Sequence, residues 1–235
     1  MTTLLAVPLL LASAFALQPP GEFHAGETVA RDGETWLALH SDAQATALRE
    51  VIVRARPWHD VVLDEGQEKS GVQISVAAGG ATPLLLVRGA GLRAGTIDAA
   101  KVQRDTDASG ASSSLPDYHL RFRAQDFRIH TACSQPAMDT AKPAKRICSI
   151  VLHTPQGKQT LARMPGTLSD GAWQLGDDAA PELLFAGDLD RDGRLDLVFN
   201  LTDHYNVSRP VLLLSSAARD GDAVAEVARF ESVGC

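Results

Sequence analysis

The chain has 235 residues and a formal net charge of −7 at pH 7, and 45% of its residues are hydrophobic against 22% charged. This balance is typical of globular proteins and excludes a disordered chain, while the length suits one domain or two. The 22 Lys and Arg residues form no basic run, which disfavours nucleic acid as a partner. Most of the acidity comes from aspartate, which favours turns, or sites that need short carboxylates, over helices.

The N-terminus carries an apolar stretch over residues 4–17. It is shorter than the roughly 20 residues needed to span a bilayer, and Ala-Phe-Ala at residues 14–16 matches the small-x-small pattern of a signal-peptidase site. We therefore predict a signal peptide over residues 1–16, a mature chain that begins at Leu17, and no membrane span after cleavage. The predicted location is periplasmic or secreted. A buried N-terminal strand or helix is the alternative.

Short segments with the apolar patterns of strands follow one another along the chain. Residues 72–76 and 118–124 alternate between apolar and polar side chains, as in strands with one buried face. Residues 84–87 form a continuous apolar run, which is typical of a strand buried on both faces. Residues 41–47 begin with Ser-Asp and are compatible with a short capped helix. About ten short strands predict a mainly β protein with antiparallel, sandwich-like or barrel-like sheets.

The three cysteines allow one disulfide, which an exported chain can keep. Cys133 and Cys148 lie at the edges of two strand-like segments joined by a loop that contains proline. We predict that these two form a disulfide and close the hairpin, which leaves Cys235 unpaired. A bond between Cys235 and either of the other two is the alternative.

The most informative segment is the aspartate-rich loop at residues 188–196. Its aspartates occupy positions 1, 3, 5 and 9, with Gly193 at position 6, a spacing that this composition produces by chance about once in a thousand chains. Ca²⁺ prefers six to eight oxygen ligands, which alternate carboxylates of a tight loop can supply while glycine permits the turn. A solvated turn is the alternative. The predicted ligands are the carboxylates of Asp188, Asp190, Asp192 and Asp196 and the carbonyl oxygen of Arg194.

The context of this loop is not that of an EF-hand. An EF-hand loop has a bidentate Glu at position 12 between two helices, whereas position 12 here is Phe199 and both flanks are strand-like. Residues 187–197 resemble the FG-GAP or VCBS calcium hairpin, in which Asp-x-Asp-x-Asp-Gly-x-x-Asp precedes an apolar strand. The motif occurs once, whereas propellers repeat it, so the resemblance implies a lone Ca²⁺ hairpin on another β fold. We divide the chain into a β-rich domain, 17–180, and a calcium-hairpin segment, 181–235, packed on the same domain.

A second polar cluster, residues 203–206, follows the strand after the loop. His204 and Tyr205 are candidates for a ligand site, with His204 as an acid or base, and a capped turn is the alternative. No set of residues is predicted to be catalytic. The predicted function is a non-enzymatic binding or surface-interaction module, stabilised by one structural Ca²⁺, with a glycan or an envelope protein as partner. The alternative is a periplasmic hydrolase of glycans or peptides with a calcium-supported active-site loop.

Overall fold

The computed structural model describes residues 15–41, 45–77, 81–105, 115–134, 146–169 and 172–234. These ranges contain strands and turns but no helix, which confirms the predicted mainly β class with antiparallel sheets. Within them, accordingly, no helix has the length and apolar character needed to cross a bilayer. The helix expected at residues 41–47 is wrong: Ser41 and Thr46 pair across two antiparallel strands, and residues 42–44 lie outside the described ranges.

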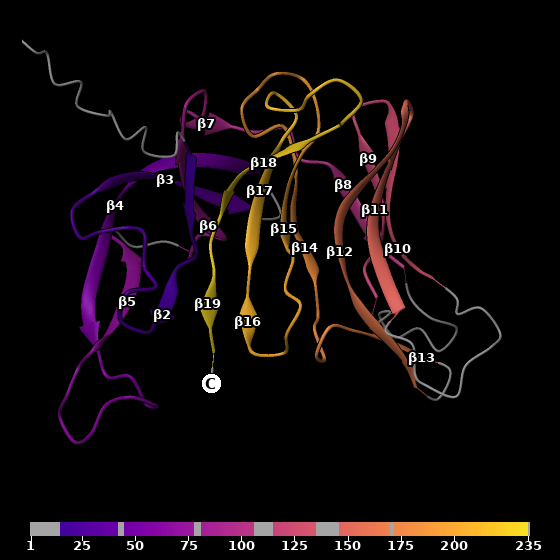
Figure 1. The fold of residues 1–235 in the computed structure, drawn as a ribbon. Helices are drawn as coiled ribbons and strands as arrows, with labels where there is room; N and C mark the ends of the chain where they lie inside the picture. The colour runs from indigo at the N-terminus through magenta and orange to yellow at the C-terminus, as the bar shows by residue number, and fades with distance from the viewer. Residues whose placement is uncertain are drawn as a thin grey trace, which may run out of the picture.

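The first part of the chain forms a seven-stranded sheet (Figure 1). Its order is β1-β6-β3-β4-β5-β2, and β7 pairs with β4. Three of the four residues in the continuous apolar run belong to β6 and are buried, as predicted. The strands are β1 Phe15–Gln18, β2 Gly21–Phe23, β3 Thr35–Ser41, β4 Thr46–Trp58, β5 Gly71–Val76, β6 Leu85–Gly89 and β7 Gly95–Thr96.

The middle part forms a six-stranded sheet in the order β13-β12-β11-β10-β9-β8. Along β9, Tyr118, Leu120 and Phe122 are buried while His119 and Arg121 are exposed, which is the predicted alternation. The strands are β8 Lys101–Arg104, β9 Asp117–Phe122, β10 Gln125–Cys133, β11 Arg146–Thr154, β12 Gly157–Ser169 and β13 Ala172–Leu175.

The last part forms a four-stranded sheet, β14-β15-β17-β18, with β16 and β19 paired beside it. This sheet lies between the other two (Figure 1). In β15, Leu197 and Phe199 pack in a core with the six-stranded sheet, while Val198 packs in a core with the seven-stranded sheet. Burial on both faces of the sheet explains why the sequences of its central strands are continuously apolar. The strands are β14 Glu182–Gly187, β15 Asp196–Asn200, β16 Val207–Ser208, β17 Pro210–Leu214, β18 Ala225–Arg229 and β19 Ser232–Val233.

The described part of the predicted signal peptide is short. Residues 1–14 lie outside the described ranges, while Phe15 and Ala16 belong to β1 and pair with β6. The side chain of Leu17 is fully buried, and the Gln18 side-chain oxygen accepts backbone hydrogen bonds from the segment before β3. Cleavage after Ala16 would therefore remove half of β1 and keep its two most buried residues.

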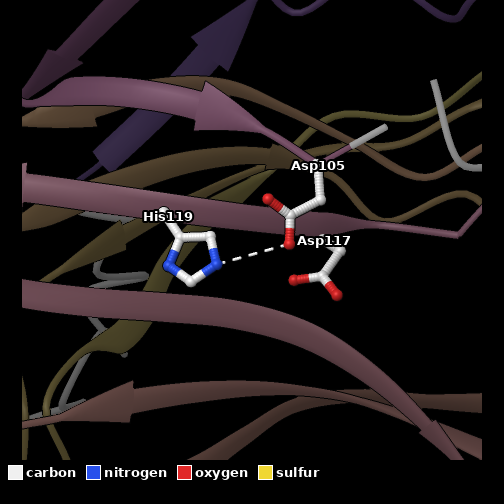
Figure 2. Close-up of side chains that lie close together, drawn as sticks. All are labelled: Asp105, Asp117 and His119. Atoms are coloured by element: carbon white, nitrogen blue, oxygen red, sulfur yellow. Dashed lines mark ion pairs between the residues drawn. The ribbon is translucent and has the colours of Figure 1, made fainter. Parts of the chain in front are cut away.

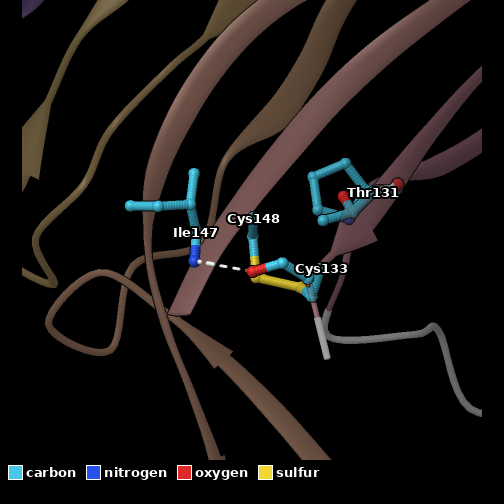
Figure 3. The surroundings of a disulfide bond; sticks show 6 residues. Thr131, Cys133, Ile147 and Cys148 are labelled. Atoms are coloured by element: carbon cyan, nitrogen blue, oxygen red, sulfur yellow. Dashed lines mark hydrogen bonds between the residues drawn. A yellow bond between two sulfur atoms is a disulfide. The ribbon is translucent and has the colours of Figure 1, made fainter. Parts of the chain in front are cut away.

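The predicted disulfide between Cys133 and Cys148 is confirmed (Figure 3). The two cysteines are directly opposite each other in the antiparallel pair β10–β11. The bond closes a loop over a sequence separation of 15 residues. Cys235 lies outside the described residues.

Reduction of this disulfide is expected to destabilise the fold. Closing a loop of this length stabilises a protein by about 3 kcal/mol in the chain-entropy model. For a chain of this size, that corresponds to a fall in melting temperature of about 6–12 °C. Calorimetry with and without dithiothreitol measures the shift, with the Cys133→Ser/Cys148→Ser double variant as control. An unchanged melting temperature in a sample whose thiols are shown to be reduced would contradict the prediction.

Candidate metal centre

The aspartate loop joins β14 to β15 at one end of the central sheet. Gly187 at the end of β14 pairs with Asp196 at the start of β15, so the two ends of the loop lie side by side. Gly193, at position 6, has a φ of 88°, a conformation that residues with a Cβ rarely adopt. A Cβ added to it would also lie only 2.9 Å from the guanidinium of Arg123. The predicted need for glycine at this position thus has a conformational cause, because the guanidinium lies at the end of a flexible side chain and can move away from a Cβ.

Three of the four predicted carboxylates converge. One oxygen atom from each of Asp188, Asp190 and Asp196 lies within 4.8 Å of the other two. Burial raises the pKa of Asp188, and it raises the pKa of Asp196 to about 7. Carboxylates this close repel one another, so the cluster favours either protonation or a bound cation.

Hydrogen bonds hold two of these carboxylates in place. Asp188 Oδ2 accepts from the backbone N–H of Gly193 at 2.9 Å. Asp196 Oδ2 accepts from the N–H of Leu189, and its Oδ1 accepts from both the N–H and the hydroxyl of Ser215, each at 2.8 Å. The second oxygen of Asp188, Oδ1, is buried and has no hydrogen-bond partner among the described residues. Burying a charged oxygen without a partner is costly, and a metal ion would offset that cost.

The side chains of the other two residues predicted to supply ligands pair with each other. Asp192 lies outside the group of three and forms an ion pair with Arg194, with the two guanidinium nitrogens 2.8 and 2.7 Å from Oδ2. The hydroxyl of Ser215 lies 3.2 Å from both oxygens of Asp192, which keeps this carboxylate at the border of the cluster. Coordination by Asp192 and by the carbonyl oxygen of Arg194 stays a prediction.

An arginine from the six-stranded sheet contacts the loop and was not predicted. Arg123, in the β9–β10 turn, donates to the carbonyl oxygen of Gly193 at 3.0 Å and lies 3.3 Å from Asp188 Oδ2. It also pairs with the carboxylate of Asp98 at 3.2 Å. The backbone carbonyl of Asp98 in turn accepts from the N–H of Asp188. The loop is therefore attached to the chain between β7 and β8 and to the β9–β10 turn.

Two serines directly after β17 complete the cluster. Ser215 bonds Asp196 as described, and the hydroxyl of Ser216 donates to Asp190. In the sequence, the two serines are marked only by their place directly after the apolar run that becomes β17. This place does not reveal that β17 pairs with β15, and that pairing is what brings the serines to the loop. Long-range strand pairing, not local spacing, brings these hydroxyls to the loop.

A cleft of about 640 Å³ borders the loop. It lies where the β9–β10 and β11–β12 turns meet the aspartate loop and the segment after β17. None of its described lining residues is a histidine. Its apolar side chains include Phe122, Phe127, Leu152 and Leu195. Its charged side chains are Arg123, Lys158, Arg194 and Asp222.

The predicted ligand-site pair lies away from both the loop and the cleft. The aspartate loop precedes β15, whereas His204 and Tyr205 follow it, at its other end. Their rings lie 4.6 Å apart, and His204 Nε2 is 2.8 Å from a carboxylate oxygen of Asp177. Tyr205 is 67% exposed. The two residues are thus brought together, but their role as a ligand site stays a prediction.

A second group with metal-ligand chemistry lies on β8–β9 (Figure 2). His119 Nε2 is 3.3 Å from a carboxylate oxygen of Asp105, and Asp117 lies beside them. Arg128 donates two hydrogen bonds to Asp117, at 3.0 and 2.8 Å, and lies 3.7 Å from Asp105. Because the guanidinium already supplies positive charge, we interpret this group as a surface ion-pair network.

Comparison with known proteins gives no relative: no protein-family model, no curated protein and no solved structure matches the chain. The resemblance to the FG-GAP or VCBS hairpin therefore rests on the spacing of the loop residues and on their strand–loop–strand context.

Proposed function

We propose that the aspartate loop binds one Ca²⁺ and that the ion is structural. The observation that carries this proposal is the buried Asp188 Oδ1, which has no hydrogen-bond partner among the described residues and belongs to a cluster of three carboxylates. A cation at this point would contact an oxygen that no described protein group satisfies. It would also relieve the repulsion among Asp188, Asp190 and Asp196.

The chemistry of the ligands favours calcium over other metals. The group offers carboxylate oxygens and neighbouring serine hydroxyls, with no histidine or cysteine among them. Oxygen-only sites suit hard cations, and Ca²⁺ tolerates irregular coordination by the residues of a loop, whereas Mg²⁺ demands a near-ideal octahedron. Extracellular modules bind Ca²⁺ with dissociation constants of about 10⁻⁴–10⁻³ M. Such an affinity is sufficient for an exported protein, which is the location we propose.

The position of the loop supports a structural role. It contacts the turn of the six-stranded sheet through Arg123, the chain beyond β7 through Asp98, and the end of β17 through Ser215. An ion bound here would hold together segments that belong to different layers. We therefore propose a calcium-stabilised binding or surface-interaction module with a glycan or envelope protein as partner.

The hydrolase alternative has less support. The candidate acid or base of that alternative would have to lie beside the loop, but His204 does not line the cleft there. His204 lies instead at the other end of β15, so the structure brings no predicted acid or base to the loop among the described residues.

Calorimetric titration with Ca²⁺ tests the proposal directly. The wild-type protein should bind one ion, and Asp190→Ala should weaken binding by about tenfold or more because one of three converging carboxylates is lost. Asp220→Ala is the matched control, since Asp220 is an exposed aspartate after β17 that belongs to neither of the two candidate groups among the described residues. Equal affinities for wild type and Asp190→Ala would refute the site.

A further inference from the structure

Two arginines connect the aspartate loop to the neighbouring cleft. Arg123 pairs with Asp188, and Arg194 pairs with Asp192. Both arginines also line the cleft of about 640 Å³. The same two residues therefore contact the aspartates of the loop and line a space of the size that small molecules occupy.

The wall of the cleft combines apolar side chains with positive charge. Phe122, Leu152 and Leu195 line its inner wall with almost fully buried side chains, and Phe127 is partly exposed. The exposed Lys158 adds a third cation, and it forms no ion pair with any described residue. Asp222 is the only acidic residue among the described lining residues. A ligand that complements this surface has an apolar body and a negative head group.

We propose that this cleft binds a small amphipathic anion, a carboxylate or sulfonate on an apolar body, and that Ca²⁺ in the aspartate loop strengthens this binding. The proposal rests on the calcium site proposed above. Because a divalent ion neutralises carboxylates that Arg123 and Arg194 otherwise neutralise, its binding frees positive charge at the wall of the cleft. Lys158 supplies charge that is present with or without calcium.

This coupling has a thermodynamic consequence. If calcium raises the affinity for the anion by a given factor, the anion must raise the affinity for calcium by the same factor. Gly193 and Leu195 line the cleft and lie within the aspartate loop, so the loop conformation that binds the ion also shapes the wall that contacts the anion. The two sites share residues and do not need a conformational change transmitted over distance.

A set of three probes separates the two properties of the ligand. 1-Naphthoate carries both the apolar body and the charge, 1-naphthamide is its neutral isostere, and acetate has the charge alone. Calorimetry on the full chain should show naphthoate binding about tenfold tighter in saturating Ca²⁺ than in EDTA, within the usual range of coupling between sites. Naphthamide should bind more weakly and without dependence on calcium because it has no charge, and acetate should bind more weakly because it lacks the apolar body. Equal binding of naphthoate and naphthamide, or no binding of naphthoate, overturns the anion assignment.

Variants locate the binding and separate this proposal from the calcium site. Lys158→Gln should weaken naphthoate binding severalfold while leaving the Ca²⁺ affinity unchanged, and Ala124→Trp should block the cleft. Lys101→Gln, the same change on the exposed strand β8 outside the cleft, is the matched control.

If Ca²⁺ binds but the naphthoate affinity is the same in calcium and EDTA, the coupling is wrong and the calcium site stands. If wild type and Asp190→Ala bind Ca²⁺ equally, the calcium site itself is wrong.

Discussion

The Asp188→Asn variant is expected to be more stable than the wild-type protein in EDTA and less stable in saturating calcium. In EDTA, the substitution removes a buried negative charge that lies close to two other carboxylates. The substitution relieves this repulsion and keeps a side-chain oxygen that can accept from the N–H of Gly193. The ion pair that it removes involves the half-exposed Arg123 and is worth about 0–1 kcal/mol, so we expect a net gain of about 1 kcal/mol. In calcium at a hundred times its dissociation constant, the wild-type protein gains about 2.7 kcal/mol that the variant lacks.

Thermal unfolding in the two buffers measures this reversal. For a protein of this size, the calcium-induced rise in melting temperature should be about 5–10 °C for wild type and close to zero for Asp188→Asn. The Asp220→Asn variant, which makes the same chemical change at an exposed aspartate, should respond to calcium like the wild type. If Asp188→Asn keeps the full calcium response, Asp188 is not a ligand.

Local spacing was sufficient to predict the cluster of aspartates, because its carboxylates follow one another in sequence. It predicted the convergence of Asp188, Asp190 and Asp196 and the role of Gly193. It did not predict that Asp192 pairs with Arg194, because the direction of two flexible side chains depends on contacts that spacing does not specify.

The contacts from outside the loop could not be predicted from spacing. Arg123 reaches Asp188 across 65 residues, and Ser215 reaches Asp196 across 19. Both contacts depend on how the three sheets pack. The sequence has no mark that distinguishes Arg123 from the other exposed arginines of the six-stranded sheet.

The same distinction applies to the fold. Alternating and continuous apolar patterns predicted strands and their degree of burial, as in β9 and β6. They could not predict the order of the strands or the three layers, because pairings such as β1 with β6 join segments about 70 residues apart. The capped helix expected at residues 41–47 failed for the same reason: the pairing of β3 with β4 outweighs the weak local preference for a helix.

The stability of the metal-free protein is expected to fall as the pH rises from about 4 to about 7. Burial raises the pKa of Asp196 from 3.8 in its ordinary state to about 7 in the folded protein. Between these values the folded state holds a proton that the unfolded state has released, so increasing pH favours unfolding. The free energy of unfolding should fall by up to about 4 kcal/mol across this range. Above pH 7 the titration of Asp196 should cause no further change.

In saturating calcium the free energy of unfolding should not fall with pH over this range, because the ion binds the deprotonated carboxylate. Its affinity is therefore expected to rise with pH up to about 7 and then level off. Urea unfolding at a series of pH values, in metal-free buffer and in saturating calcium, measures both effects. Asp196→Asn keeps an acceptor for Ser215 but cannot titrate, so it should lose most of the slope that Asp220→Asn retains. An unchanged slope in Asp196→Asn would show that another group causes the pH dependence, and the buried carboxylate would then not be the residue that couples protons to the ion.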